Sequence, residues 1–260
     1  MRNHLAVIFL AGAGLIFSSG LTAAATRQVP VGEKETATAG QNLQGVWNMH
    51  ATMAEFLHYL ASTYTAQEPE MTPWAKKKFD EAKPSFGRNI MARGQRKNSL
   101  KETDDPVLKY CYPPGTPRIY LQPFPMQIVQ TPKEVIILYE YDHTVRHVYT
   151  DGRPHSPDLT PTYMGDSIGH WEGNTLVADT IGFNTKTWLD RMGHPHSDQL
   201  HVIERFTRTS PTDLQIAITM EDPKALVKPW QATLNFQLKP DWHIMEQVCT
   251  DNIDFLNFEH

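Results

Sequence analysis

The sequence predicts a mainly β fold: an antiparallel barrel with a helical insertion near its N-terminal end. From about residue 110 onward, short runs of β-branched and aromatic residues alternate with turn signals such as Asp151-Gly152 and Glu172-Gly173-Asn174. The connections carry no crossover helices, so neighbouring strands should pair antiparallel. A sheet with this many strands usually curls into a barrel or sandwich, which removes its exposed edges.

Pro, Asp and Gly residues bound the predicted strands. The first strand begins at Gly45-Val46-Trp47. The later strands are expected at residues 126–130, 134–142, 144–150, 167–171, 175–183, 199–209, 214–220, 231–238 and 243–249. All of them fit within a single domain over residues 42–260, long enough for a substantial core.

The N-terminal end is typical of a secretory signal peptide. Arg2 provides a positive charge, residues 5–17 are apolar, and Ala23 and Ala25 supply the small residues of a cleavage site. The apolar run is shorter than the ~20 residues that a membrane span needs. We therefore expect a signal peptide over residues 1–25, a flexible leader over 26–41, and a periplasmic or secreted protein with no stable membrane insertion.

The helical insertion is expected over about residues 52–100. Met53, Phe56, Leu57 and Leu60 have the spacing of one helix face. A second helix should begin at Thr72-Pro73, since Thr is a favoured N-cap and Pro a favoured first helical residue, and should end near residue 83. The basic stretch over residues 76–101 is interpreted as a solvated surface rather than a nucleic-acid patch.

Net charge and cysteine content limit the function further. The chain has a formal net charge of −5, which argues against general nucleic-acid binding. It contains two cysteines, Cys111 and Cys249, and both would meet an oxidising compartment after export. The simplest interpretation is one disulfide between them, and the alternative is a catalytic thiol.

Two resemblances support these expectations. The Gly-x-Trp on the first strand resembles the start of a lipocalin-type barrel. The segment over residues 165–180, GDSIGHWEGNTLVADT, resembles the G-D-S-x-G-x-W-E-G-D-T-L-V-V-D-T of a large, mostly uncharacterised group of exported bacterial proteins. The chain departs from that pattern at His170, Asn174 and Ala178. The resemblance implies export and a β-rich fold, and it implies no particular activity.

Strand alternation places several acidic residues on apolar faces. Asp179 shares a face with Val177 and Ile181, and Glu204 shares one with Val202 and Phe206. Glu140 and Glu246 follow the same pattern. Buried carboxylates need partners, and Arg146 is the nearest candidate cation. These acids are interpreted either as parts of a polar pocket at the barrel mouth or as buried ion pairs that fix the strand register.

Histidines and aromatic residues complete the candidate site. His196, in the loop His194-Pro195-His196, could act as a general acid or base near neutral pH. The candidate catalytic residues are Asp179, Glu204, Glu140, Arg146 and His196. The candidate substrate-binding residues are Tyr139, His147, Tyr163, Trp171 and Trp188. We expect no cofactor and no metal, although the histidine-rich loops leave a metal as the alternative.

These features predict a barrel that binds a small, partly apolar and aromatic or terpenoid-like molecule. The expected activity is cofactor-independent acid/base chemistry of the lyase, isomerase or hydratase type. The alternative is a non-catalytic periplasmic ligand carrier or an envelope-associated protein. Titratable groups that converge in a pocket would favour the enzyme, and a uniformly apolar cavity would favour the carrier.

Overall fold

The computed structural model describes residues 41–55, 60, 62–85, 98 and 101–250. The predicted signal peptide over 1–25 and the leader over 26–40 lie outside the described residues, as does most of the basic stretch. None of the described helices is both long and apolar enough to cross a membrane.

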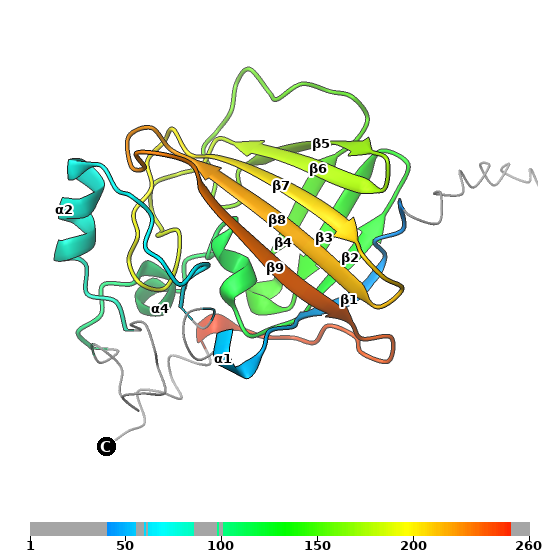
Figure 1. Ribbon diagram of the computed structural model, residues 1–260, viewed down its shortest axis with the longest axis horizontal. Helices are drawn as coiled ribbons and strands as arrows, with labels where there is room; N and C mark the ends of the chain where they lie inside the picture. Colours follow the sequence, from blue (N-terminus) through cyan, green and yellow to red (C-terminus); the bar gives the residue numbers. More distant parts are fainter. Residues whose placement is uncertain (1–40, 56–59, 61, 86–97, 99–100, 251–260) are drawn as a thin grey trace, which may run out of the picture. The chain divides into compact units, whose positions relative to one another are not determined.

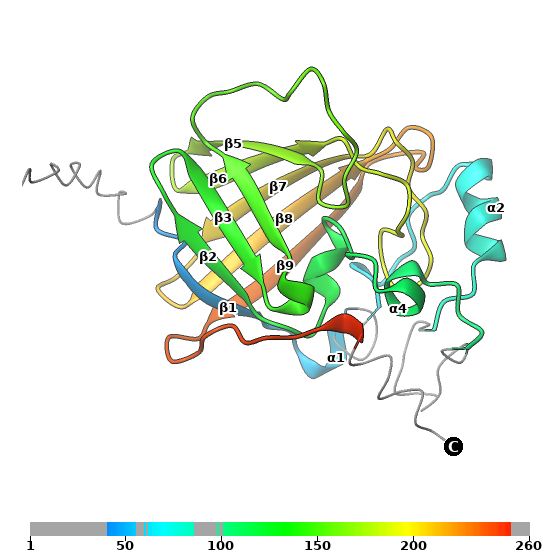
Figure 2. The same ribbon diagram turned by 180° about the vertical axis from the view of Figure 1, so that it is seen from behind.

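The described residues form nine strands that close into a barrel (Figures 1 and 2), which confirms the predicted mainly β fold. The strands are β1 Gly45–Met49, β2 Met126–Gln130, β3 Glu134–Tyr139, β4 Val145–Tyr149, β5 Asp166–Glu172, β6 Thr175–Ile181, β7 His201–Arg208, β8 Asp213–Glu221 and β9 Trp230–Leu238. Each strand pairs with its neighbour in the chain, and β1 pairs with β9 to close the barrel.

The barrel is mixed rather than purely antiparallel. Among the described strands, β4 and β5 are the one neighbouring pair that runs parallel, and they share two residue pairs, Val148–Ser167 and Tyr149–Ile168. The cause is the long connection over residues 150–165, which arches over β5 and β6 in both views (Figures 1 and 2) and returns the chain in the same direction. The predicted antiparallel pairing at this position was therefore wrong.

Strand alternation fills the barrel interior. In β8 the buried positions are Leu214, Ile216, Ile218 and Met220, and the residues between them are partly exposed. Trp47 on β1 is fully buried, and its indole N–H donates to the Leu43 carbonyl oxygen over 2.8 Å. A buried indole keeps its polar group satisfied in this way.

Short helices occur in the connections between the strands. They are α1 Met53–Glu55, α2 Pro73–Glu81, α4 Pro106–Tyr110 and the 3-10 helices η3 Arg118–Leu121 and η4 Tyr141–His143. The start of α2 is confirmed, since Thr72 is its N-cap and accepts from the Ala75 N–H. Of the first predicted helix, the structure describes the start, which is α1, and residue 60. Residues 56–59 lie outside the described range.

The disulfide between Cys111 and Cys249 is present, with Cα atoms 5.6 Å apart. Cys111 follows α4, whereas Cys249 lies beyond the last strand. The predicted strand over 243–249 is not one. This segment docks on η4 through side chains instead: the Asp142 N–H donates to Gln247, and the Met245 N–H donates to Glu140.

Candidate functional site

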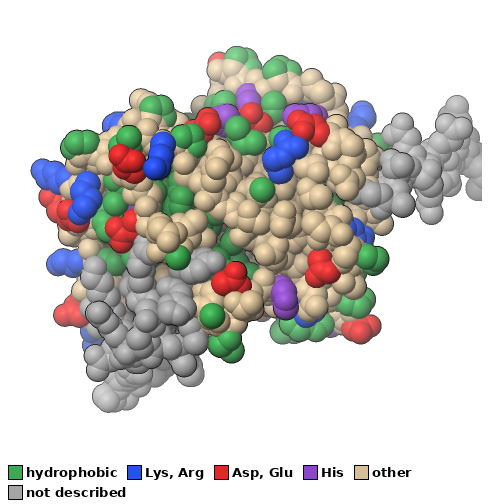
Figure 3. All heavy atoms as spheres, viewed as in Figure 1, with side chains coloured by type: hydrophobic (Ala, Val, Ile, Leu, Met, Phe, Trp, Pro, Cys, Tyr) green, Lys and Arg blue, Asp and Glu red, His purple; other side chains and the backbone are tan. Residues whose placement is uncertain are grey.

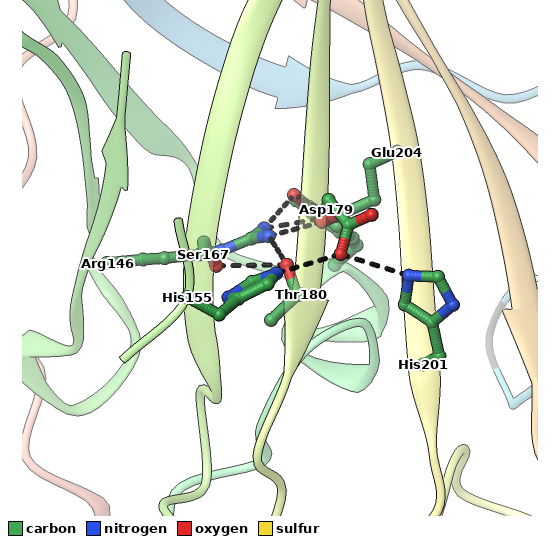
Figure 4. A network of polar contacts seen from close by, with 8 residues as sticks. Arg146, His155, Ser167, Asp179, Thr180, His201 and Glu204 are labelled. Atoms are coloured by element: carbon green, nitrogen blue, oxygen red, sulfur yellow. Dashed lines mark hydrogen bonds and ion pairs between the residues drawn. The ribbon is translucent and has the colours of Figure 1, made fainter. Parts of the chain in front are cut away.

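A buried ion pair lies inside the barrel, between Arg146 of β4 and Glu204 of β7 (Figure 4). Glu204 is fully buried, as its position beside Val202 and Phe206 predicted. The Arg146 Nη1 donates to Glu204 Oε1 over 3.0 Å, and Nη2 donates to Oε2. The expected pairing of an interior acid with Arg146 is therefore confirmed.

Three hydroxyl groups complete the network around this pair. Arg146 also donates to the Ser167 hydroxyl over 3.1 Å, to Tyr120 over 3.1 Å and to Thr180 over 2.9 Å. Tyr120, which η3 places inside the barrel, donates in turn to Glu204 Oε1 over 2.8 Å. All five N–H groups of the guanidinium therefore have an acceptor.

Electrostatics keeps Tyr120 and Arg146 of this network protonated. Burial, followed by the nearby Glu204 charge, raises the pKa of Tyr120 well above its usual value, so this phenol stays protonated. Burial lowers the pKa of Arg146, but the charge of Glu204, its hydrogen bond and the nearby tyrosines together raise that pKa overall. With every guanidinium donor occupied, the network ties together β4, β5, β6 and β7.

A second polar chain lies on the outer face of the barrel and is centred on Asp179. One oxygen, Asp179 Oδ1, lies 3.0 Å from His155 Nε2 and 3.0 Å from His201 Nε2 (Figure 4). At the two ends, His155 Nδ1 lies 2.7 Å from Asp166 Oδ2, and His201 Nδ1 lies 3.3 Å from Glu221. Carboxylates and imidazoles therefore alternate across five side chains. The space-filling view shows histidine and acidic side chains gathered along this edge of the molecule (Figure 3).

The prediction that Asp179 faces the interior was wrong. Its side chain is 38% exposed, and the inward residues of β6 are Leu176, Ala178 and Thr180. The loop over residues 150–165 lies against the outer face of β6 where His155 contacts Asp179, and Leu159 lies beside Gly182, just beyond the end of the strand. Both faces of the strand therefore carry apolar residues, and alternation alone cannot distinguish inside from outside.

His155 is held between two carboxylates, one on each ring nitrogen. A neutral imidazole has one N–H, so donating to both Asp166 and Asp179 requires the protonated ring. Burial acts against that charge, but the hydrogen bonds to the two carboxylates outweigh it and raise the pKa of His155 above 6.5. His155 therefore stays protonated beside Asp166 up to a higher pH than a free histidine would.

A cavity of about 490 Å³ opens where β4 and β5 separate; we call it the β4–β5 cavity. Its lining joins the two networks, because it includes Arg146 and Ser167 of the interior and Asp166 of the outer chain. The apolar part of the lining consists of Pro113, Val145, Tyr149, Tyr163 and Met164. Asp166 Oδ2 contacts His155, whereas Oδ1 takes part in no hydrogen bond between described residues.

The other predicted site residues are dispersed. His147 and Tyr163 line the β4–β5 cavity, and the His147 ring pairs with Glu134 on the outer face. Tyr139 is buried inside the barrel, and burial raises its pKa to about 12. Trp171 packs partly buried against the core.

Four more residues singled out from the sequence lie elsewhere. Glu140 lies beyond the end of β3 and accepts from the Met245 N–H, so its predicted position on a core face was wrong. Ile136 and Leu138, its supposed neighbours, are only half-buried, because the inward residues of β3 are odd-numbered. Glu246 is exposed. His196 and Trp188 line a different cavity, beside α2.

Sequence reasoning missed Asp166, His155 and His201 as a group. Strand alternation could have placed His201 outside, since it is out of phase with Val202 and Glu204 on β7. His155 lies in a loop, where no periodicity indicates which carboxylates it meets. Among the described residues, no group of three or more His, Cys, Asp and Glu side chains is arranged to hold a metal ion.

These features define the class of the protein as a closed β-barrel with a lateral cavity at its parallel strand pair. No family model matches the chain, and neither a curated protein nor a solved structure is significantly similar to it.

Proposed function

We propose that this protein is exported and binds a small, partly apolar organic molecule in the β4–β5 cavity. It acts on that molecule by cofactor-independent acid/base chemistry, of the lyase, isomerase or hydratase type. The observation that carries the proposal is the free Oδ1 of Asp166 at the edge of a largely apolar cavity, with His155 bonded to its other oxygen.

In this proposal Asp166 is the catalytic base. Its Oδ1 takes a proton from the bound molecule and returns it to a neighbouring atom or to a leaving group. The N–H of His155 stabilises the Asp166 carboxylate before it takes the proton and again after it returns the proton, and Asp179 keeps the imidazole oriented. Tyr163 remains a hydroxyl donor in the cavity, because burial and then Tyr112 raise its pKa.

The proposal gives Arg146 and Glu204 a positioning role. Glu204 holds Arg146, and Arg146 donates to the hydroxyl of Ser167, the residue next to Asp166 in the wall of the cavity. A ligand could reach the Arg146 guanidinium only by displacing an existing acceptor. That displacement is unfavourable, because it separates a buried charge from its partners.

The test begins with the exported protein purified natively, from which any retained molecule is identified by mass spectrometry. Asp166→Asn should retain that molecule but lose its conversion to product, and His155→Gln should slow the conversion. Asp158→Asn is the matched control, since Asp158 is an exposed carboxylate in the loop over residues 150–165, which also carries His155. Full conversion by Asp166→Asn would contradict the assignment of the base.

A non-catalytic carrier is the second candidate, and the apolar part of the cavity lining favours it. A carrier would release the retained molecule unchanged, and Asp166→Asn would alter its affinity rather than any product. Following the chemical identity of the molecule over time therefore separates the two functions.

Export is proposed from the N-terminal sequence together with the disulfide, which is typical of an oxidising compartment. Intact-mass measurement of the periplasmic fraction should find a chain that begins near Thr26. A full-length chain retained in the membrane would contradict export.

A further inference from the structure

A second cavity of about 420 Å³ lies between α2 and the segment that leads into β7; we call it the α2 cavity. Both ribbon views show that segment beside α2 and α4 (Figures 1 and 2). The residues that matter for its chemistry are Trp74, Lys78, Lys186, Trp188, His196 and Lys224. None of them lines the β4–β5 cavity.

The rim of the α2 cavity carries excess positive charge. Three lysines line it, Lys78, Lys186 and Lys224, against two acids, Glu81 and Asp104. Among the described residues, Lys78 and Lys186 form no ion pair, and Lys224 has a loose one of 3.8 Å with Asp198. The α2 cavity is therefore basic although the whole chain has a net charge of −5, and this local positive charge favours an anion.

Two of these ammonium groups lie against the Trp74 ring. Lys78 Nζ and Lys224 Nζ each lie 5.3 Å from the centroid of that ring. The ring attracts each cation, but two like charges around one side chain also repel each other. An anion bound to Lys78 would weaken that repulsion.

The inner wall of the cavity is aromatic and uncharged. Trp188 is half-buried, and behind it Arg118 lies 6.0 Å from its ring centroid. His196 is buried, with Nδ1 3.1 Å from the Ser197 carbonyl oxygen, so Nδ1 carries the proton. The other nitrogen, Nε2, faces the Thr187 hydroxyl at 3.4 Å. Burial lowers the pKa of His196, which keeps the ring neutral.

We propose that the α2 cavity binds a small aromatic carboxylic acid, with its carboxylate on Lys78 and Lys186 and its ring against Trp188. The cationic rim selects the charge, and the aromatic wall selects a flat apolar body. This site is separate from the proposed acid/base site and does not depend on it.

The experiment measures binding of 1-naphthoate to the full exported chain by titration calorimetry, with 1-naphthylmethanol as the uncharged comparison. The parent protein should bind the acid at least about tenfold more tightly than the alcohol. The affinity for the acid should also fall as salt is added, because the lysines are exposed to solvent.

Variants locate the site. The double variant Lys78→Gln, Lys186→Gln should bind the acid about tenfold more weakly, since two charges are lost and exposed side chains rarely affect folding. Lys239→Gln is the matched control: this lysine pairs with Gln237 and lies outside both cavities. Equal affinity for acid and alcohol, unchanged binding by the double variant, or no binding of the acid to the parent would each overturn the proposal.

Discussion

Replacing Glu204 by Gln should destabilise the protein strongly, because it leaves the Arg146 charge buried without its counterion. Glu204 accepts three hydrogen bonds, two from Arg146 and one from Tyr120, and both members of the ion pair are at most 2% exposed. Removing one partner of such a pair typically costs about 3–5 kcal/mol. For a domain of this size, that loss lowers the melting temperature by roughly 6–20 °C.

A double-mutant cycle separates this cost from the value of the pair. Arg146→Met should be as damaging as Glu204→Gln, but the double variant should recover most of the loss, because no unpaired charge remains. Thermal and urea unfolding followed by circular dichroism measures all four proteins. Glu172→Gln is the control, since it breaks an exposed pair with Arg205 and should leave the melting temperature near that of the parent. A Glu204→Gln variant within about 1 kcal/mol of the parent would refute the reasoning.

Three further perturbations test other features. Replacing Cys111 and Cys249 by Ser opens a loop with a sequence separation of 138 and should lower the free energy of unfolding by about 5 kcal/mol in the chain-entropy model. Urea unfolding measures this loss, and a negligible loss would contradict the prediction. Burial lowers the pKa of His196 below 6.5, so the unfolded chain takes up a proton before the folded protein does, and stability should fall as pH falls below about 6.5. His196→Gln should flatten that acid-side loss in unfolding curves recorded from about pH 5 to about pH 7.5, and an unchanged slope would exclude this residue as the cause. Gly165→Ala should destabilise the protein more than Gly152→Ala. Both glycines have positive φ (72° and 80°), but only a Cβ at Gly165 meets a side chain, that of Thr180, 2.6 Å away. Equal melting temperatures of the two variants would show that this steric contact contributes nothing.

The strand boundaries were predictable because the turns are encoded locally. Asp151-Gly152 follows β4, and Gly173-Asn174 separates β5 from β6; the positive φ of Gly152 and Gly173 explains why glycine occurs there. The parallel pairing of β5 was not predictable in this way. It depends on the path of residues 150–165 across the barrel, which no turn signal records.

Prediction of which side chains point inward succeeded where a strand has one buried face and failed where it has two. Glu204 follows the alternation of β7, so its burial could be read from its neighbours. Asp179 lies on a strand with apolar residues on both faces, and its partner His155 comes from a loop. Contacts between a loop and a strand depend on tertiary packing, so the sequence pattern carries no signal for them.

The short ladder between β4 and β5 also sets where the native barrel opens. Two residue pairs join these strands, whereas eight join β7 and β8. Because local opening requires less free energy where fewer hydrogen bonds must break, backbone amides along the β4–β5 seam should exchange with deuterium before those of β7 and β8. If the β4–β5 cavity holds a molecule as proposed, that molecule would bind the closed form and slow this exchange. Slower exchange along the seam in the presence of the ligand would therefore place the bound molecule beside the parallel strand pair.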